Sequence, residues 1–145
     1  MLRFTEGNQL RAAQLLGIAR QTLRTKLRDL GVTVDYRARD ARGGTWLFLL
    51  TGAYSVTRPG LKRADVLWRA LGVAAVLHEA RAADSGRDDL GPLVLLTTDL
   101  PASRSAGGRA LRTVTGAGRP VRDVCELGDP ESAGRLAGHA TGAGH

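Results

Sequence analysis

Apolar residues near the start of the chain recur every three or four positions. This spacing predicts two short amphipathic helices, each with one apolar stripe. The two stripes consist of Leu10, Ala13 and Leu16, then Leu23, Leu27 and Leu30. Gly17 separates the helices where a tight turn favours a positive φ, and Gly31 follows the second helix where a left-handed C-cap is usual.

Beyond Gly31 the pattern becomes that of strands and crossover helices. Alternation over 32–39 predicts a half-buried strand, whereas the uninterrupted apolar run 45–51 predicts a central strand covered on both faces. A long helix is expected from about residue 60 to 81. The later elements expected are a strand at 93–98, a short helix at 109–114 and a strand at 121–127. The order β-β-α-β-α-β predicts a small α/β domain with a mostly parallel sheet.

The second predicted N-terminal helix carries polar and cationic side chains opposite its leucines. Such a face suits the major groove of DNA, because a guanidinium can pair with guanine and an amide with adenine. The candidate DNA-binding residues on this helix are Arg20, Gln21, Arg24, Thr25, Lys26 and Arg28. The alternative is an ordinary amphipathic hairpin with a solvated cationic face. The ordered spacing of Ala13, Gly17, Ile18 and Leu23 favours DNA binding.

The segment 7–31 resembles the helix-turn-helix of the Fis type, found in Fis and at the C-terminus of bacterial enhancer-binding activators. The positions that carry the resemblance, without gaps, are Gly7-Asn8, Arg11-Ala12-Ala13, Leu16-Gly17-Ile18, Arg20, Thr22-Leu23-Arg24, Lys26-Leu27 and Leu30-Gly31. The resemblance implies that Arg20 and Arg24 face bases. It implies that Asn8, Thr22 and Lys26 hold phosphates, and we include Arg11 among the DNA-binding residues.

Three regions are expected along the chain. Residues 1–31 form the α-helical helix-turn-helix module, whose first helix is truncated because only six residues precede the motif. A second copy of the chain, a partner subunit or another segment would complete that module. Residues 32–127 form the α/β domain, of unknown role. Residues 128–145 form a flexible, disordered tail, because they contain almost no large apolar side chains.

Charge supports a nucleic-acid partner. The net charge is +7, and residues 1–42 hold nine Lys/Arg against four Asp/Glu, whereas 43–145 hold twelve against ten. The excess therefore concentrates around the predicted DNA module, as binding by counterion release requires. The single cysteine, Cys125, excludes an internal disulfide. The apolar runs are too short to cross a bilayer, so we expect a cytoplasmic protein that is not bound to a membrane.

No catalytic set assembles from the sequence. The β-β-α-β order resembles the core of restriction-type nucleases, with Asp35 as a first carboxylate, but the strand 46–50 offers neither an acidic residue nor Lys. The run 103–109, Ser-Arg-Ser-Ala-Gly-Gly-Arg, could cradle a phosphate, although it lacks the Gly-Lys-Ser/Thr ending of a P-loop. A surface loop is the favoured interpretation. We expect no catalytic residue, metal ligand or cofactor.

The sequence thus predicts a bacterial, transcription-linked regulator that binds double-stranded DNA through a Fis-type helix-turn-helix. Two alternatives stay open. One is a nuclease-like α/β enzyme, or its inactive remnant, that carries a DNA-binding module. The other is a terminal fragment of a larger activator.

Overall fold

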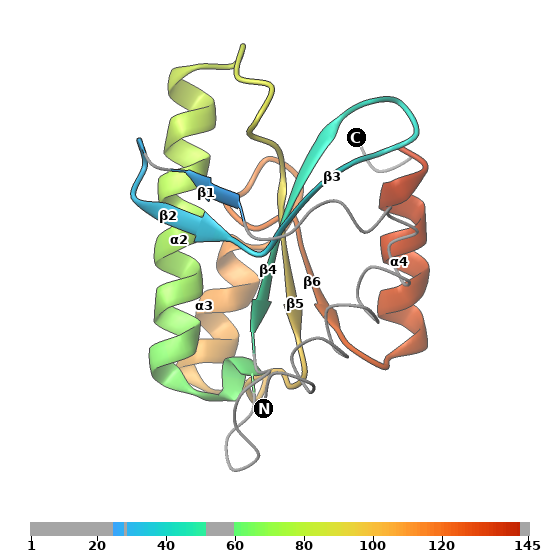
Figure 1. Cartoon of the computed structure of the whole chain (residues 1–145). Helices are drawn as coiled ribbons and strands as arrows, with labels where there is room; N and C mark the ends of the chain where they lie inside the picture. The colour runs from blue at the N-terminus through green and yellow to red at the C-terminus, as the bar shows by residue number, and fades with distance from the viewer. Residues whose placement is uncertain (1–24, 28, 52–59, 143–145) are drawn as a thin grey trace.

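A four-stranded sheet separates two layers of helices (Figure 1). The computed structural model describes residues 25–27, 29–51 and 60–142. The sheet has the order β3-β4-β5-β6, in which β3 is antiparallel to β4 and the other two pairs are parallel. The strands are β3 (Tyr36–Arg39), β4 (Thr45–Thr51), β5 (Leu93–Thr97) and β6 (Asp123–Glu126).

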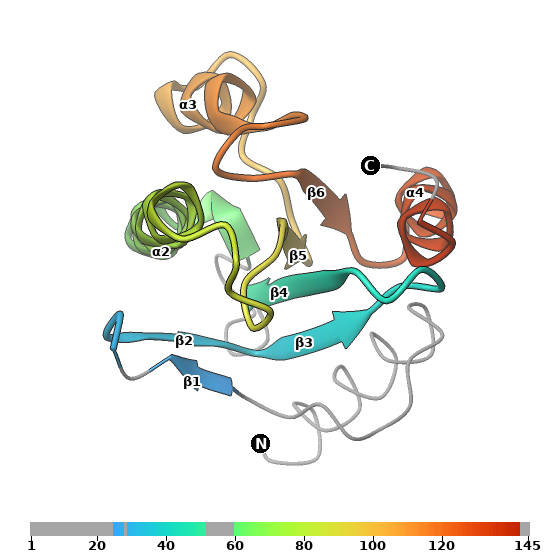
Figure 2. The same cartoon turned by 90° about the horizontal axis from the view of Figure 1, so that it is seen from above.

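Helices cover both faces of this sheet. The helix α2 (Ala64–Ala83), which follows the 3-10 turn η1 (Gly60–Lys62), lies with α3 (Ala106–Val114) on one face. The last helix, α4 (Pro130–Ala140), lies on the other face (Figure 2). Each parallel pair is joined by one crossover helix, α2 between β4 and β5 and α3 between β5 and β6.

Strict alternation along β4 and β5 fills two separate cores. Leu47 and Leu95 pack with α2 and α3, whereas Phe48 and Leu96 pack toward α4. All five residues of β5 are buried, which explains why its sequence is a continuous apolar run. The two strands also come close just before β5 begins. A Cβ atom on Gly91 would lie 1.8 Å from the carbonyl oxygen of Thr45, so only glycine fits there.

The structure corrects the expected N-terminal helical module where it describes that segment. Thr25–Leu27 forms the strand β1, which pairs antiparallel with β2 (Val32–Val34). Leu27 is 4% exposed and belongs to the core under α2. Gly31 has a positive φ of 68°, but it turns the chain between two strands instead of capping a helix. The tertiary burial of Leu27 overrides its helical spacing. The remainder of the predicted module, residues 1–24 and 28, lies outside the described residues.

The predicted sheet is also wrong in its directions. The expected strand over 32–39 divides at Asp35, whose carboxylate accepts a 2.7 Å hydrogen bond from the Leu50 N–H. Val34 therefore packs under α2 while Tyr36 packs toward α4. The antiparallel pairs β1–β2 and β3–β4 balance the two parallel pairs. The sheet structure is consequently mixed, not mostly parallel.

The expected flexible tail is replaced by α4 over most of its length. Asp129 is the N-cap, accepting a 2.9 Å hydrogen bond from the Ser132 N–H, and Pro130 occupies the first turn. Leu136 anchors the helix with 2% exposure. The composition of this segment did not predict a helix, because the helix depends on one buried leucine and on its capping residues.

The position of Leu27 gives a stability prediction. Leu27→Ala removes a buried side chain from the core shared with α2 and should lower the free energy of unfolding by about 2–5 kcal/mol. Urea unfolding followed by tryptophan fluorescence measures the loss, since Trp46 is 2% exposed. Leu100→Ala, at a leucine that is 40% exposed, is the control and should change stability by less than about 0.5 kcal/mol. Equal, small effects of both substitutions would contradict the place of β1 in the core.

Candidate nucleic-acid interface

The predicted DNA-binding residues fall almost wholly outside the part of the chain that the structure describes. Thr25 and Lys26 are within it, and their backbones pair with Val34 and Thr33 across the β1–β2 ladder. These two residues therefore lie on a strand and not on a recognition helix. The others, which lie outside the described residues, are Asn8, Arg11, Arg20, Gln21, Thr22, Arg24 and Arg28.

An arginine ties the β1–β2 hairpin to the loop after α2. Arg87 places one guanidinium nitrogen 2.6 Å from a carboxylate oxygen of Asp29 and another 2.7 Å from Asp89. The hydrogen bonds that Arg87 donates to Asp89 and then to Asp29 raise the pKa of Arg87, and its guanidinium in turn lowers the pKa of Asp89. The end of the Fis-like segment is thus held against the α/β domain by an ion-pair network as well as by Leu27.

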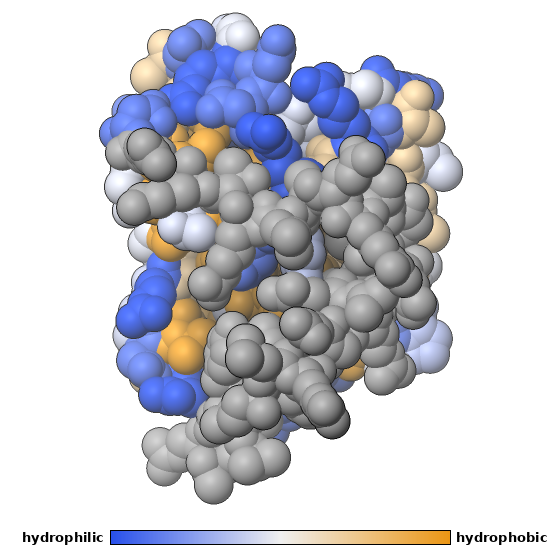
Figure 3. Space-filling model, viewed as in Figure 1, coloured by the Kyte–Doolittle hydropathy of each residue, from blue (hydrophilic) through white to orange (hydrophobic). Residues whose placement is uncertain are grey.

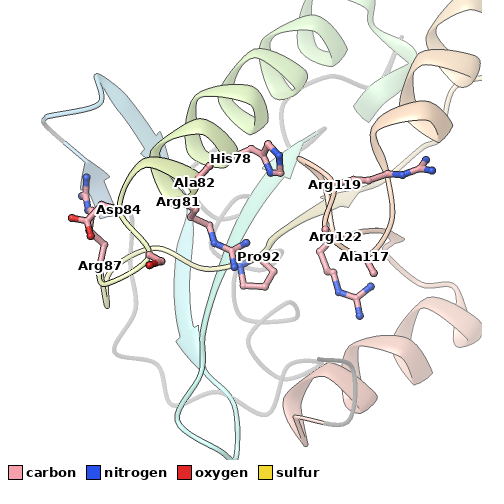
Figure 4. Close-up of a pocket in the computed structure, with 11 residues that line it drawn as sticks. His78, Arg81, Ala82, Asp84, Arg87, Pro92, Ala117, Arg119 and Arg122 are labelled. Carbon is pink, nitrogen blue, oxygen red and sulfur yellow. The ribbon is translucent and has the colours of Figure 1, made fainter.

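A cavity of about 450 Å³ opens beside this loop, between the end of α2 and the α3–β6 connection (Figure 4). Hydrophilic residues gather over the same loop in the space-filling view (Figure 3). Arg81 and Arg122 lie on either side of Pro92 (Figure 4). The cationic and imidazole side chains that line the cavity are His78, Arg81, Arg87, Arg119 and Arg122.

Much of the charge around this cavity is already offset. Arg87 is paired with two carboxylates, and Asp84 also lines the wall. Arg119 donates hydrogen bonds to carbonyl groups at the end of α3, where the helix dipole is negative. The cavity alone is therefore a weak anion site. Sequence reasoning missed this group of arginines because they come from three segments that are far apart in the chain.

A polar cluster under α4 serves packing. His139 Nε2 lies 3.0 Å from a carboxylate oxygen of Asp123, and the Arg135 Nε lies 3.1 Å from the same oxygen. The His139 ring stacks obliquely on Trp46 with 4.7 Å between ring centroids. Burial alone would raise the pKa of Asp123, but the His139 hydrogen bond and the Arg135 charge outweigh it and hold that pKa below its usual value. The cluster fixes α4 to β6.

The remaining candidate residues show no reactive arrangement. Burial raises the pKa of Cys125 to about 12, so its thiolate is scarce at neutral pH. Asp35 accepts the Leu50 backbone hydrogen bond and thereby stabilises the junction of β2 and β3. Within residues 25–142, less the gaps at 28 and 52–59, no three His, Cys, Asp or Glu side chains meet as a metal site. No helix of the described ranges is long and apolar enough to cross a membrane.

Comparison with known proteins concerns the N-terminal segment. Residues 1–30 match the family described as bacterial regulatory protein, Fis family. A segment of 40 residues, which is 28% of the chain, is 55% identical to the DNA-binding transcriptional regulator NtrC of Rhizobium meliloti (strain 1021). Over 33 residues, 23% of the chain is 61% identical to the NtrC of Azospirillum brasilense.

The chain spans only 8% and 7% of the length of these two relatives, and no solved structure matches it. The resemblance to Fis-type proteins that the sequence predicted is confirmed, and it covers only part of the chain. The function of the α/β domain must be argued from its own residues.

The polar cluster under α4 gives a prediction with a defined pH dependence. Asp123→Asn should lower the free energy of unfolding by about 1–3 kcal/mol at neutral pH, because it removes a charged acceptor. The folded state lowers the pKa of Asp123, so its contribution is complete above the ordinary aspartate pKa and is lost as the pH falls below it. The two proteins should therefore converge in acid.

Urea unfolding at a series of pH values measures this convergence. Asp65→Asn is the matched control, because Asp65 forms an exposed ion pair with Arg63 and should leave the unfolding midpoint nearly unchanged. A difference between Asp123→Asn and the unchanged protein that stays constant from acid to neutral pH would contradict the proposed role of the charge.

Proposed function

We propose that this chain binds double-stranded DNA as a transcription-linked regulator of bacterial type. The observation that carries the proposal is the match of residues 1–30 to the Fis family of regulatory proteins. Two relatives, similar over 40 and 33 residues, are named as DNA-binding transcriptional regulators. The same segment carries six Lys/Arg against two Asp/Glu, a positive excess that favours phosphate binding. A cytoplasmic location, with a second copy of the chain as a further partner, is part of the proposal.

Each proposed contact follows from side-chain chemistry. Arg20 and Arg24 present forked guanidinium groups that can bind guanine O6 and N7 together, so they are proposed to read bases. Lys26 carries a compact charge suited to phosphate oxygens. The other proposed contacts, which can donate hydrogen bonds to bases or phosphates, are Asn8, Arg11, Gln21, Thr22, Thr25 and Arg28.

Base reading and phosphate binding separate experimentally. Arg20→Ala should weaken binding to a preferred duplex by roughly 1–3 kcal/mol and relax the preference at one position, whereas Lys26→Ala should weaken all duplexes alike. Selection from a randomised duplex pool supplies the preferred site, and fluorescence anisotropy with preferred and scrambled duplexes measures the discrimination.

The control must carry the same charge change as the test. Arg63→Ala/Arg69→Ala removes two exposed cations at the start of α2, and Arg20→Ala/Arg24→Ala removes two from the Fis-like segment. Only the latter pair should abolish discrimination between the duplexes. If both double variants bind and discriminate like the unchanged protein, DNA reading by the Fis-like segment is wrong.

A further inference from the structure

We propose that α3 and its flanking segments form a second surface for the phosphate backbone of duplex DNA. We call this surface the basic strip. The proposal deepens the DNA-binding function argued above and rests on it, but it concerns a different part of the molecule. Its members are the exposed arginines Arg104, Arg109 and Arg112, together with Arg119, whose charge the carbonyls at the end of α3 partly offset.

Charge in the α/β domain is strongly segregated. Residues 100–122 contain five arginines and no Asp or Glu. The rest of the range 43–145 contains seven Lys/Arg against ten Asp/Glu, so the domain is otherwise acidic. A generally arginine-rich composition does not explain a stretch from which every carboxylate is missing. Such a separation creates a local positive field of the kind that attracts nucleic acid.

The arginines are held in place by backbone carbonyls and not by carboxylates. The Arg109 and Arg112 guanidinium groups donate 2.6 Å hydrogen bonds to the carbonyl oxygens of Arg104 and Ser103, respectively. Among the described residues, Arg109 and Arg112 form no ion pair with Asp or Glu. Each guanidinium therefore keeps its full charge and most of its donors for an external acceptor, while its side chain is already ordered.

These hydrogen bonds also place the cations along α3. Arg109 and Arg112 donate to the adjacent carbonyls of Arg104 and Ser103. Arg112 reaches back nine residues to Ser103, and Arg119 reaches back to the carbonyl oxygen of Thr113 at 2.9 Å. The strip therefore has two parts, the paired Arg109 and Arg112 beside the loop before α3 and Arg119 at the end of α3. Two cations held side by side suit neighbouring phosphates of a nucleic-acid strand.

The alternative of a glycine-rich backbone cradle at 103–109 does not fit as well. The Gly108 N–H donates to the Ser105 hydroxyl oxygen at 3.0 Å, so this N–H already caps the helix. Residues from Ala106 onward are helical and do not form an open loop. The arginine side chains, and not a loop of free N–H groups, therefore supply the donors.

The basic strip lies away from the β1–β2 hairpin, which contains the described end of the Fis-like segment. Figure 2 shows α3 and the β1–β2 hairpin on the same side of the sheet, with α2 between them, and Leu27 and Leu111 belong to the same core. Effects of substitutions on well-separated surfaces add in free energy. Loss of the strip should therefore multiply the loss caused by Arg20→Ala/Arg24→Ala and should not depend on it.

The test compares full-length variants in anisotropy titrations with a duplex over a series of salt concentrations. Arg109→Gln/Arg112→Gln removes two charges but keeps donors for the two carbonyls. Affinity should fall on the order of tenfold, and the slope of log K against log salt should decrease by about 1.8, roughly 0.9 for each lost phosphate contact. Arg109→Lys/Arg112→Lys should retain most of the slope. Arg63→Gln/Arg69→Gln is the control outside the strip.

The outcomes separate the two proposals. Equal affinity and slope for the strip variant and the control overturn the basic strip, whatever Arg20→Ala/Arg24→Ala does. If Arg109→Gln/Arg112→Gln weakens binding while Arg20→Ala/Arg24→Ala binds and discriminates normally, the basic strip is supported. The same result overturns base reading by the Fis-like segment. Circular dichroism melts check that each variant is folded. If the Gln pair is not, the single variants Arg109→Gln and Arg112→Gln replace it, each with an expected slope decrease of about 0.9.

Competition identifies the source of the phosphate. Tripolyphosphate and duplex RNA are added at matched phosphate concentration to the complex with duplex DNA. Weak competition by both supports a surface shaped for duplex DNA. Displacement by tripolyphosphate at equal potency would overturn the proposal in favour of a small-anion site, and equal displacement by duplex RNA would overturn the assignment to DNA.

Discussion

The parallel pairing of β4 with β5 is the constraint on which the rest of the structure depends. These strands are covered on both faces, and alternate residues such as Leu47 and Phe48 belong to different cores. A shift of one residue in their register would exchange every side chain between the α2 side and the α4 side. The close contact of Gly91 with the Thr45 carbonyl limits how the chain can enter β5. With this pair fixed, the flanking helices and strands have defined surfaces to cover.

The local pattern of apolar residues predicted an element correctly where a single hydrophobic period, or an unbroken apolar run, marks it. The apolar run of β4 was predicted at 45–51 and the strand is Thr45–Thr51, because a doubly covered strand needs no alternation. The terminal helix α4 was missed, because it depends on the Asp129 cap and on polar contacts to Asp123 from β6. Contacts that join residues distant in sequence have no local signature, and the arginines of the α2-side cavity were missed for the same reason.

Charge and hydrophobicity are divided differently in this chain. The two cores use both faces of the sheet, so β4 and β5 need apolar residues at consecutive positions. The cores do not constrain where charged residues lie. Residues 100–122 contain arginines but no Asp or Glu. The net charge of residues 43–145 is only +2, so the total does not reveal this local excess of arginine. The separation of charge appears when Lys/Arg and Asp/Glu are counted over one helix and its flanking segments. A contact surface for a partner has about this length.

Leu27 shows why the two halves of the chain cannot be treated as independent. It lies within the residues that match the Fis family, and its side chain is buried in the core under α2. Its spacing from Leu23 and Leu30 suits a helix, yet a residue in the β1–β2 ladder cannot be helical at the same time. In the structure Leu27 is on the strand and packs in the core, and Asp29 adds an ion pair with Arg87. The described end of the Fis-like segment is therefore part of the folded α/β domain. If the segment binds DNA as proposed, a ligand that favours the folded hairpin would also stabilise the α/β domain.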